Sequence, residues 1–288
     1  MTGVQTCALP ISTISWSYVI PHEGNFQQAL HRTLSSGQIP PGTLTLVTGT
    51  EGRNLFAINS VIESICIEEA LKRLKDPVLA VVSMGGEDLV VYTLGENNKI
   101  LTTFSGSKCA SGTGEFFRQQ LARMDMTLEE VNKVPDSSRV LSLSTRCSVF
   151  MKSDCTHRLN KREATKGDIV VSLSNVMATK VTDFLKRAKI DRGKVLVCGG
   201  TTLNRHFIRF LRDNNQDIEF ILPPEAPFFE AFGAALLAGK VGTPLPPEEK
   251  ILKQNSIRFT RYNNLKSAES MVTYHMAEIG RASCRERV

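Results

Sequence analysis

Two cysteines stand beside basic residues at points where helices are expected to begin. Cys109 follows Lys108 in KCASGTGEFF, and Cys147 follows Arg146 in RCSVF. A helix N-terminus and a neighbouring cation both stabilise a thiolate, the form of cysteine that binds iron. A single cysteine of this kind would more often be ordinary buried packing. Two thiolates are half of a four-cysteine cluster site, and a two-fold dimer would bring four together.

Two glycine pairs follow buried-strand patterns. Gly85 and Gly86 lie in VVSMGGED, and Gly199 and Gly200 lie in VLVCGGTTLN. Small residues between a strand and a helix expose backbone N–H groups and permit close approach, which suits phosphates and a nucleoside. Each pair alone would indicate only a tight turn. Two pairs at matching places in the chain predict a nucleotide site.

The elements that must position these residues alternate between strand and helix patterns, which predicts an α/β fold. Three strands in succession are expected first, at 78–84, 89–94 and 99–104. A long amphipathic helix at 168–187 follows, and then strand, helix, strand and helix at 194–198, 203–212, 219–222 and 228–238. This order is that of a ribonuclease-H-like half of the bilobal actin/hexokinase fold.

The chain before residue 78 predicts the tail of a second βα unit. A helix at 25–34, a buried strand at 43–48 and a helix at 59–74 are expected there, without the opening strands of such a domain. Residues 1–12 (MTGVQTCALPIS) and 278–288 (EIGRASCRERV) read like translated sequencing adapters and are left out of the fold argument.

The resulting division has five parts. They are an adapter-like segment at 1–12, an incomplete first ribonuclease-H-like lobe at 13–77, a second lobe with a cluster-binding insertion at 78–240, a linker or extension at 241–277, and an adapter-like segment at 278–288.

Composition excludes several classes of function. The formal net charge is +6, but Lys and Arg are scattered among acids, so a nucleic-acid partner is not expected. No apolar run approaches the length of a membrane span. Outside the end segments the cysteines are odd in number and no secretion signal precedes them, which indicates a reducing, cytoplasmic compartment. They are Cys66, Cys109, Cys147, Cys155 and Cys198.

Four segments occur in the order KCASGTGEFF, RCSVFMKSD, VLVCGGTTLNRHF and PFFEAFGAALLAG. Over residues 43–240 they resemble the BadF/BadG/BcrA/BcrD ATPase family, especially its activators of 2-hydroxyacyl-CoA dehydratases and benzoyl-CoA reductases. The resemblance implies an actin-like ATPase that binds ATP or ADP with Mg²⁺ and passes an electron to a CoA-ester dehydratase or reductase. It further implies a homodimer that shares one [4Fe–4S] cluster, with Cys109 and Cys147 as this chain's ligands, and ferredoxin or flavodoxin as electron donor.

The resemblance also assigns the nucleotide-site residues. They are Gly85, Gly86, Glu87, Asp88, Gly112, Thr113, Gly114, Gly199, Gly200, Asn204 and Gly233. Glu63 and Cys66 match a family Glu-x-x-Cys, while Cys66, Cys155 and Cys198 are expected to be structural. No catalytic residue is identified.

Two departures from the family pattern bear on ATP hydrolysis. An Asp-x-Gly-Ser/Thr phosphate loop is missing near the start, and Ser83 stands where the second loop has an aspartate. Glu87 or Asp88 could compensate. Ser83 and the PLPPEE segment favour an alternative reading, a degenerate nucleotide-binding regulatory module of a large multidomain protein. A further alternative is an actin-fold small-molecule kinase resembling N-acetylglucosamine kinase.

Overall fold

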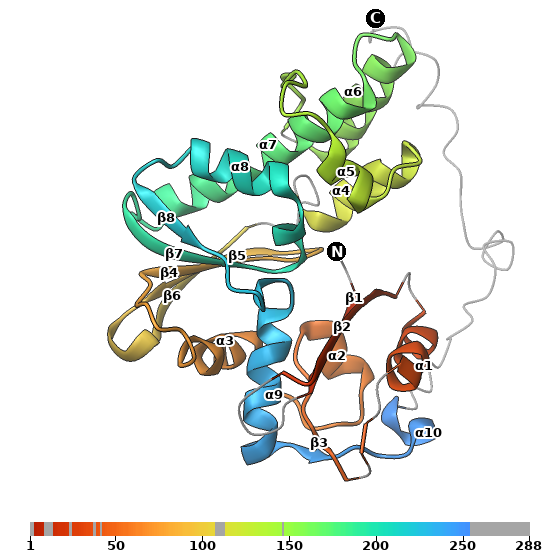
Figure 1. The fold of residues 1–288 in the computed structure, drawn as a ribbon, viewed down its shortest axis with the longest axis vertical. Coiled ribbons are helices and arrows are strands. Elements are labelled where there is room, and N and C mark those ends of the chain that lie inside the picture. The colour runs from red at the N-terminus through yellow and green to blue at the C-terminus, as the bar shows by residue number, and fades with distance from the viewer. Residues whose placement is uncertain are drawn as a thin grey trace, which may run out of the picture. The chain divides into compact units, whose positions relative to one another are not determined.

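A five-stranded sheet organises the chain in the computed structural model, which describes residues 3–8, 14–22, 25–36, 39–40, 42–106, 113–145 and 147–253. Its spatial order is β6-β5-β4-β7-β8 (Figure 1). The strands are β4 (Ala80–Met84), β5 (Leu89–Leu94), β6 (Ile100–Ser105), β7 (Gly193–Cys198) and β8 (Ile218–Ile221). β4 pairs antiparallel with β5 and parallel with β7, β5 pairs antiparallel with β6, and β7 pairs parallel with β8. The predicted ribonuclease-H-like order is confirmed.

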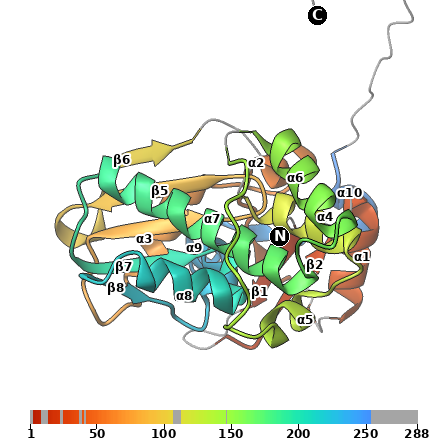
Figure 2. The same ribbon diagram turned by 90° about the horizontal axis from the view of Figure 1, so that it is seen from above.

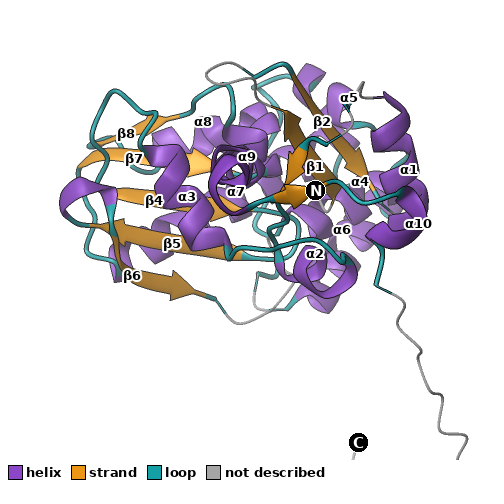
Figure 3. Ribbon diagram, turned by 90° about the horizontal axis from the view of Figure 1, so that it is seen from below, coloured by secondary structure: helices purple, strands orange, loops and turns teal. Residues whose placement is uncertain are grey.

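Helices cover both faces of this sheet. α7 (Lys166–Arg187) and α8 (Arg205–Asp213) lie over one face, seen from above in Figure 2. α3 (Glu63–Leu71) and α9 (Phe229–Val241) lie over the other, seen from below in Figure 3. The central strand β4 is therefore buried along its whole length and reads as a nearly continuous apolar run, AVVSM. Val82 and Met84 pack in the cluster of α7 and α8, while Val81 packs with α3 and α9.

An insertion of helices separates β6 from α7. It contains α4 (Gly114–Arg123), α5 (Leu128–Lys133) and α6 (Ser148–Asn160). Phe116 of α4 and Met151 of α6 pack into the same hydrophobic cluster as the start of α7. α5 and α7 each begin with a reciprocal capping box, which fixes both helix starts in the sequence.

The remaining elements are β1 (Gly3–Ala8), β2 (Trp16–Pro21), α1 (Phe26–Ser36), β3 (Leu44–Thr45), α2 (Thr50–Leu55), β9 (Thr243–Pro244) and α10 (Glu248–Ile251), with the 3-10 turns η1 (Glu96–Asn98), η2 (Gly200–Leu203) and η3 (Ala226–Phe228). A small apolar cluster joins α1, the end of α2 and α10 through Leu30, Phe56 and Ile251. Among the described residues before α3, the strands form only two-stranded sheets, β1 with β2 and β3 with β9. Through β9 and α10, the chain after α9 returns to pack on residues near the N-terminus.

Several sequence expectations need correction in detail. The buried strand expected at 43–48 is only β3, and it is half-exposed because its partner β9 is equally short. The helix expected at 59–74 begins at Glu63. β1 lies within residues 1–12, the segment that was expected to be adapter-like. α3, which was assigned to the first lobe, packs in one hydrophobic cluster with the sheet that begins after residue 78. The proposed domain boundaries stay predictions. None of the described helices combines the length and apolar character needed to cross a membrane.

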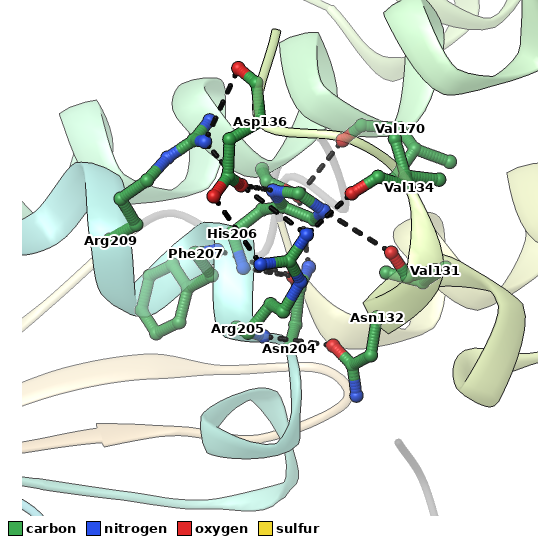
Figure 4. A network of polar contacts seen from close by, with 11 residues as sticks. Val131, Asn132, Val134, Asp136, Val170, Asn204, Arg205, His206, Phe207 and Arg209 are labelled. Carbon is green, nitrogen blue, oxygen red and sulfur yellow. Dashed lines mark hydrogen bonds and ion pairs between the residues drawn. The ribbon is translucent and has the colours of Figure 1, made fainter. Parts of the chain in front are cut away.

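A polar network fastens α8 to the segment that follows α5 (Figure 4). Asp136 forms ion pairs with Arg205 and Arg209 and lies 3.4 Å from Nδ1 of His206. The His206 side chain is fully buried, and its Nε2 lies 3.2 Å from the Val131 carbonyl oxygen. Burial lowers the pKa of His206, the two arginines lower it further, and Asp136 opposes them.

Lowering the pH from about 7 to about 5 should therefore destabilise the fold through His206, because the unfolded chain binds the proton at its ordinary pKa of about 6.5. The folded imidazole binds the proton less readily, so this contribution to stability is present above the unfolded pKa and is lost as the pH falls towards the lowered folded pKa. His206→Gln should flatten the pH dependence of the unfolding temperature, whereas His157→Gln, at an exposed position of α6, should not. An unchanged slope in His206→Gln would contradict the assignment.

Candidate functional site

The two glycine turns meet at one edge of the sheet. β4 and β7 are parallel neighbours, so the turns that follow them, Gly85–Gly86 and Gly199–Gly200, emerge side by side. Gly199 has a φ of +99°, and a Cβ there would lie 2.2 Å from the Met84 carbonyl oxygen. Thr201 donates a 2.8 Å hydrogen bond to the same oxygen. A side chain at 199 is thus excluded, and the backbones of the two turns are held in direct contact.

The first turn also receives the start of α4. The backbone N–H of Gly114 donates to the Gly85 carbonyl (3.1 Å), and that of Glu115 donates to the Gly86 carbonyl (2.8 Å). Thr113, the N-cap residue, is buried here, while Gly112 lies outside the described residues. These contacts use helix N–H groups that would otherwise lack partners. The predicted Gly85, Gly86, Thr113 and Gly114 are therefore brought together.

Glu87 and Asp88 occupy the tip of the β4–β5 turn. Both are exposed, and the Gly85 N–H donates to the Asp88 carbonyl oxygen at 3.1 Å, which closes the turn. Their exposure leaves them accessible beside the glycine turns. The structure does not place either side chain in contact with Ser83.

Asn204 and Gly233 have structural surroundings. The Asn204 side chain is buried, accepts hydrogen bonds from the backbone N–H groups of His206 and Phe207, and donates to Ser174. A Cβ at Gly233 would lie 1.9 Å from the Cys66 carbonyl oxygen, so this glycine permits the close crossing of α9 and α3. Capping and helix packing account for both residues, and their roles in nucleotide binding stay predictions.

An acidic group at the same edge was not predicted. Ser83 donates a 2.7 Å hydrogen bond to Oε1 of Glu230, which lies in the first turn of α9. Burial raises the pKa of Glu230, the carboxylates of Glu63 and Asp88 raise it further, and the Ser83 hydrogen bond opposes them. Glu63 is itself paired with Arg53 at 2.5 Å. The signal in the sequence was the single charge within PFFEAFGAALLAG.

The cysteines divide into two kinds. Cys147 is half-buried at the N-cap of α6, as expected, and its thiol makes no capping hydrogen bond; Cys109 lies outside the described residues. The other three are buried, and burial raises the pKa of Cys66 and of Cys155 to about 11 and that of Cys198 well above the usual thiol range. They stay protonated, in keeping with packing roles. Within the described ranges, no three His, Cys, Asp or Glu side chains are grouped to hold a metal.

Comparison with known proteins decides the family. The profile of the BadF/BadG/BcrA/BcrD ATPase family matches residues 23–238. The chain belongs to this family. It is 28% identical to the 2-hydroxyisocaproyl-CoA dehydratase activator of Clostridioides difficile over 67% of this chain and 72% of that protein. It is 24% identical to the activator of lactoyl-CoA dehydratase of Anaerotignum propionicum over 67% of this chain and 74% of the relative.

A solved structure extends the comparison to the fold. The activator of the 2-hydroxyisocaproyl-CoA dehydratase from Clostridium difficile with bound ADPNP matches with a TM-score of 0.69 at 24% identity. The match covers 78% of this chain and 86% of that one. It confirms the predicted actin-like ATPase fold.

The packing role of Gly233 predicts a specific loss of stability. Gly233→Ala places a methyl group against the Cys66 carbonyl, so we expect a fall of about 1–3 kcal/mol in the free energy of unfolding. Gly239→Ala is the matched control, because it lies in the same helix with open space around it and should stabilise by up to about 1 kcal/mol. Urea denaturation measures both. Equal effects of the two variants would contradict the crossing.

Proposed function

We propose that this chain is the ATP-dependent iron–sulfur activase of a CoA-ester dehydratase or reductase. The observation that carries the proposal is the meeting of the two glycine turns at one sheet edge in a member of this ATPase family. Relatives named as activators of 2-hydroxyisocaproyl-CoA and lactoyl-CoA dehydratases support the type of partner. The partner is thus a 2-hydroxyacyl-CoA dehydratase or a benzoyl-CoA reductase-type enzyme.

ATP or ADP with Mg²⁺ binds at the glycine turns in this proposal. Gly85 and Gly199 leave backbone close to the ligand, since neither carries a side chain there. The turn tip adds Glu87 and Asp88, whose carboxylate oxygens suit a magnesium ion. The protein's part is to fix the nucleotide between lobes whose relative angle can change.

Cys109 and Cys147 hold a [4Fe–4S] cluster that two copies of the chain share. When bound, the cluster supplies one-electron transfer from a ferredoxin or flavodoxin in the cytoplasm. Cys147 suits this role because it lies half-buried at the N-cap of α6 and its thiol is not used as a cap. Val149 and Phe150, each 67% exposed in the next helical turn, supply apolar surface for a homodimer contact.

α4 connects the two sites. It starts on the carbonyls of Gly85 and Gly86, and its Arg123 donates a hydrogen bond to Thr156 of α6, the helix whose N-cap is Cys147. A displacement of the glycine turn on nucleotide binding would therefore move the support of the cysteine-bearing helix. This arrangement explains how the nucleotide can change the exposure of a cluster, and with it the reduction potential.

Ser83 favours one other candidate, a regulatory module that binds nucleotide without hydrolysing it. Both candidates bind nucleotide, but only the activase needs the cysteine pair and phosphate release. Measurement of phosphate release from ATP, together with iron content, separates them.

Iron binding tests the ligand assignment. After anaerobic reconstitution with iron and sulfide, Cys109→Ala and Cys147→Ala should each lose most iron and labile sulfide, because half a ligand set cannot hold the cluster. Cys198→Ala should keep both the iron and the sulfide, since this thiol belongs to β7 and is buried in the apolar cluster that α3 and α9 form with the sheet. A well-folded wild-type protein that binds no iron would refute the activase.

The exposed start of α6 tests the dimer. Phe150→Ser should weaken dimerisation by roughly thirtyfold or more if the residue is a central contact, as measured by sedimentation at several concentrations. Leu101→Ser is the matched control, because Leu101 is 70% exposed on β6, outside the insertion. Equal dimer constants for wild type and Phe150→Ser would place the interface elsewhere.

A further inference from the structure

The hydrogen bond between Ser83 and Glu230 joins residues far apart in the chain at the edge of the nucleotide site. We propose that Glu230, oriented by Ser83, is the carboxylate that positions the hydrated magnesium ion of the bound nucleotide. The inference deepens the proposed function and rests on it.

Glu230 lies close to both β4 and β7, the two strands that lead into the glycine turns, and this position supports the proposed role. Ser83 lies two residues before Gly85 in β4 and stands in register with Cys198, the residue that precedes Gly199. Glu230 follows η3, where the Ala226 carbonyl accepts a 2.8 Å hydrogen bond from the Gly199 N–H. Glu230 is therefore linked to both glycine turns, to one through the Ser83 hydroxyl and to the other through η3, which directly precedes α9.

The charges around Glu230 call for a cation. Glu63 and Asp88 both act on it as like charges, and the nearby Arg53 is engaged with Glu63. In the described part of the chain, Glu230 itself forms no ion pair, and its hydrogen-bond partner is neutral. A bound nucleotide adds the negative charge of its phosphates to this edge of the sheet. A divalent cation would balance the charge of the carboxylates and that of the phosphates.

Magnesium fits the groups that are present. It takes oxygen ligands and usually needs only one or two carboxylates beside the phosphates and its own water. A complete protein cage of three or more ligands is not expected, and the described residues offer none. The half-buried carboxylate of Glu230 and the exposed carboxylate of Asp88 match the one or two carboxylates that a magnesium ion needs.

Ser83 then serves to orient the Glu230 carboxylate. From the sequence, Glu87 or Asp88 was expected to compensate for the aspartate that the family pattern has at position 83. The structure instead brings a carboxylate from α9 to the Ser83 hydroxyl, while Glu87 and Asp88 stay exposed on the turn. A carboxylate is therefore present beside position 83 of the site, but it is that of Glu230 on α9 and not that of a residue on β4.

The proposal is tested by calorimetric titration of this chain with ADPNP, in Mg²⁺ and in EDTA. Glu230→Gln keeps the size and the Ser83 hydrogen bond but removes the charge. We expect the tightening that Mg²⁺ gives wild type to fall by about 10–100-fold, as for other groups that orient a metal, with affinity in EDTA unchanged. Glu225→Gln, at the N-cap of η3 just before α9, should behave as wild type.

A further variant separates a cation role from a structural one. The exchange variant Ser83→Asp/Glu230→Gln, which returns the acid to β4, should recover the Mg²⁺ effect.

The outcomes are distinct. If wild type binds no ADPNP, the proposed function fails and this inference fails with it. If wild type binds ADPNP but Glu230→Gln keeps the full Mg²⁺ effect, only the inference fails. If the exchange variant recovers nothing, the loss in Glu230→Gln came from distortion and the inference also fails. Thermal unfolding checks folding: burial raises the pKa of the Glu230 carboxyl, which opposes folding at neutral pH, so the glutamine variant should be at least as stable as wild type.

Discussion

The parallel pairing of β4 with β7 is the constraint on which the rest of the structure depends. It joins segments more than a hundred residues apart in the chain and brings their two glycine turns to one edge. The contact is tight enough that Gly199 must lack a side chain, and Thr201 fixes the opposing carbonyl of Met84. Since β4 is buried on both faces, neither strand can shift without disturbing two hydrophobic layers. The site is thus set by the sheet core, not by a flexible loop.

The insertion of α4, α5 and α6 depends on the same edge. The first N–H groups of α4 bond to the glycine-turn carbonyls, so the helix end is satisfied by the turn it stabilises. At the C-terminal end of α4, Arg123 donates a 3.5 Å hydrogen bond to Thr156 of α6, and α4, α6 and α7 all contribute residues to the main hydrophobic cluster. A rigid helix between a nucleotide turn and the cysteine-bearing α6 is the simplest physical link between the two halves of the proposed chemistry.

Local patterns were enough to predict most of this architecture. The strands of the large sheet and the long helix α7 follow from apolar periodicity, and the glycine pairs follow from strand-to-turn chemistry. The short β3 was overestimated because its apolar run pairs with only two residues of β9 and, at Val47, through a single isolated bridge to Ser60. Asn204 and Gly233 belong to recognisable motifs, but a motif does not distinguish a helix cap or a helix crossing from a ligand contact. The structure shows the cap and the crossing.

The single charge in PFFEAFGAALLAG marks Glu230 in the sequence, but its position at the site could not be predicted, because it depends on contact with Ser83, which lies 147 positions away. Because Glu230 belongs to α9, its charge affects helix packing in a way that the charge of an acid on β4 would not. Glu230 and Glu63 lie at the starts of α9 and α3, the two helices that cross at Gly233 and Cys66. Like charges at these two helix starts oppose their approach, and a cation between them would remove that repulsion. Ion binding at the site would therefore act directly on the packing of α3 against α9, so the charge of the site and the geometry of this helix pair cannot vary independently.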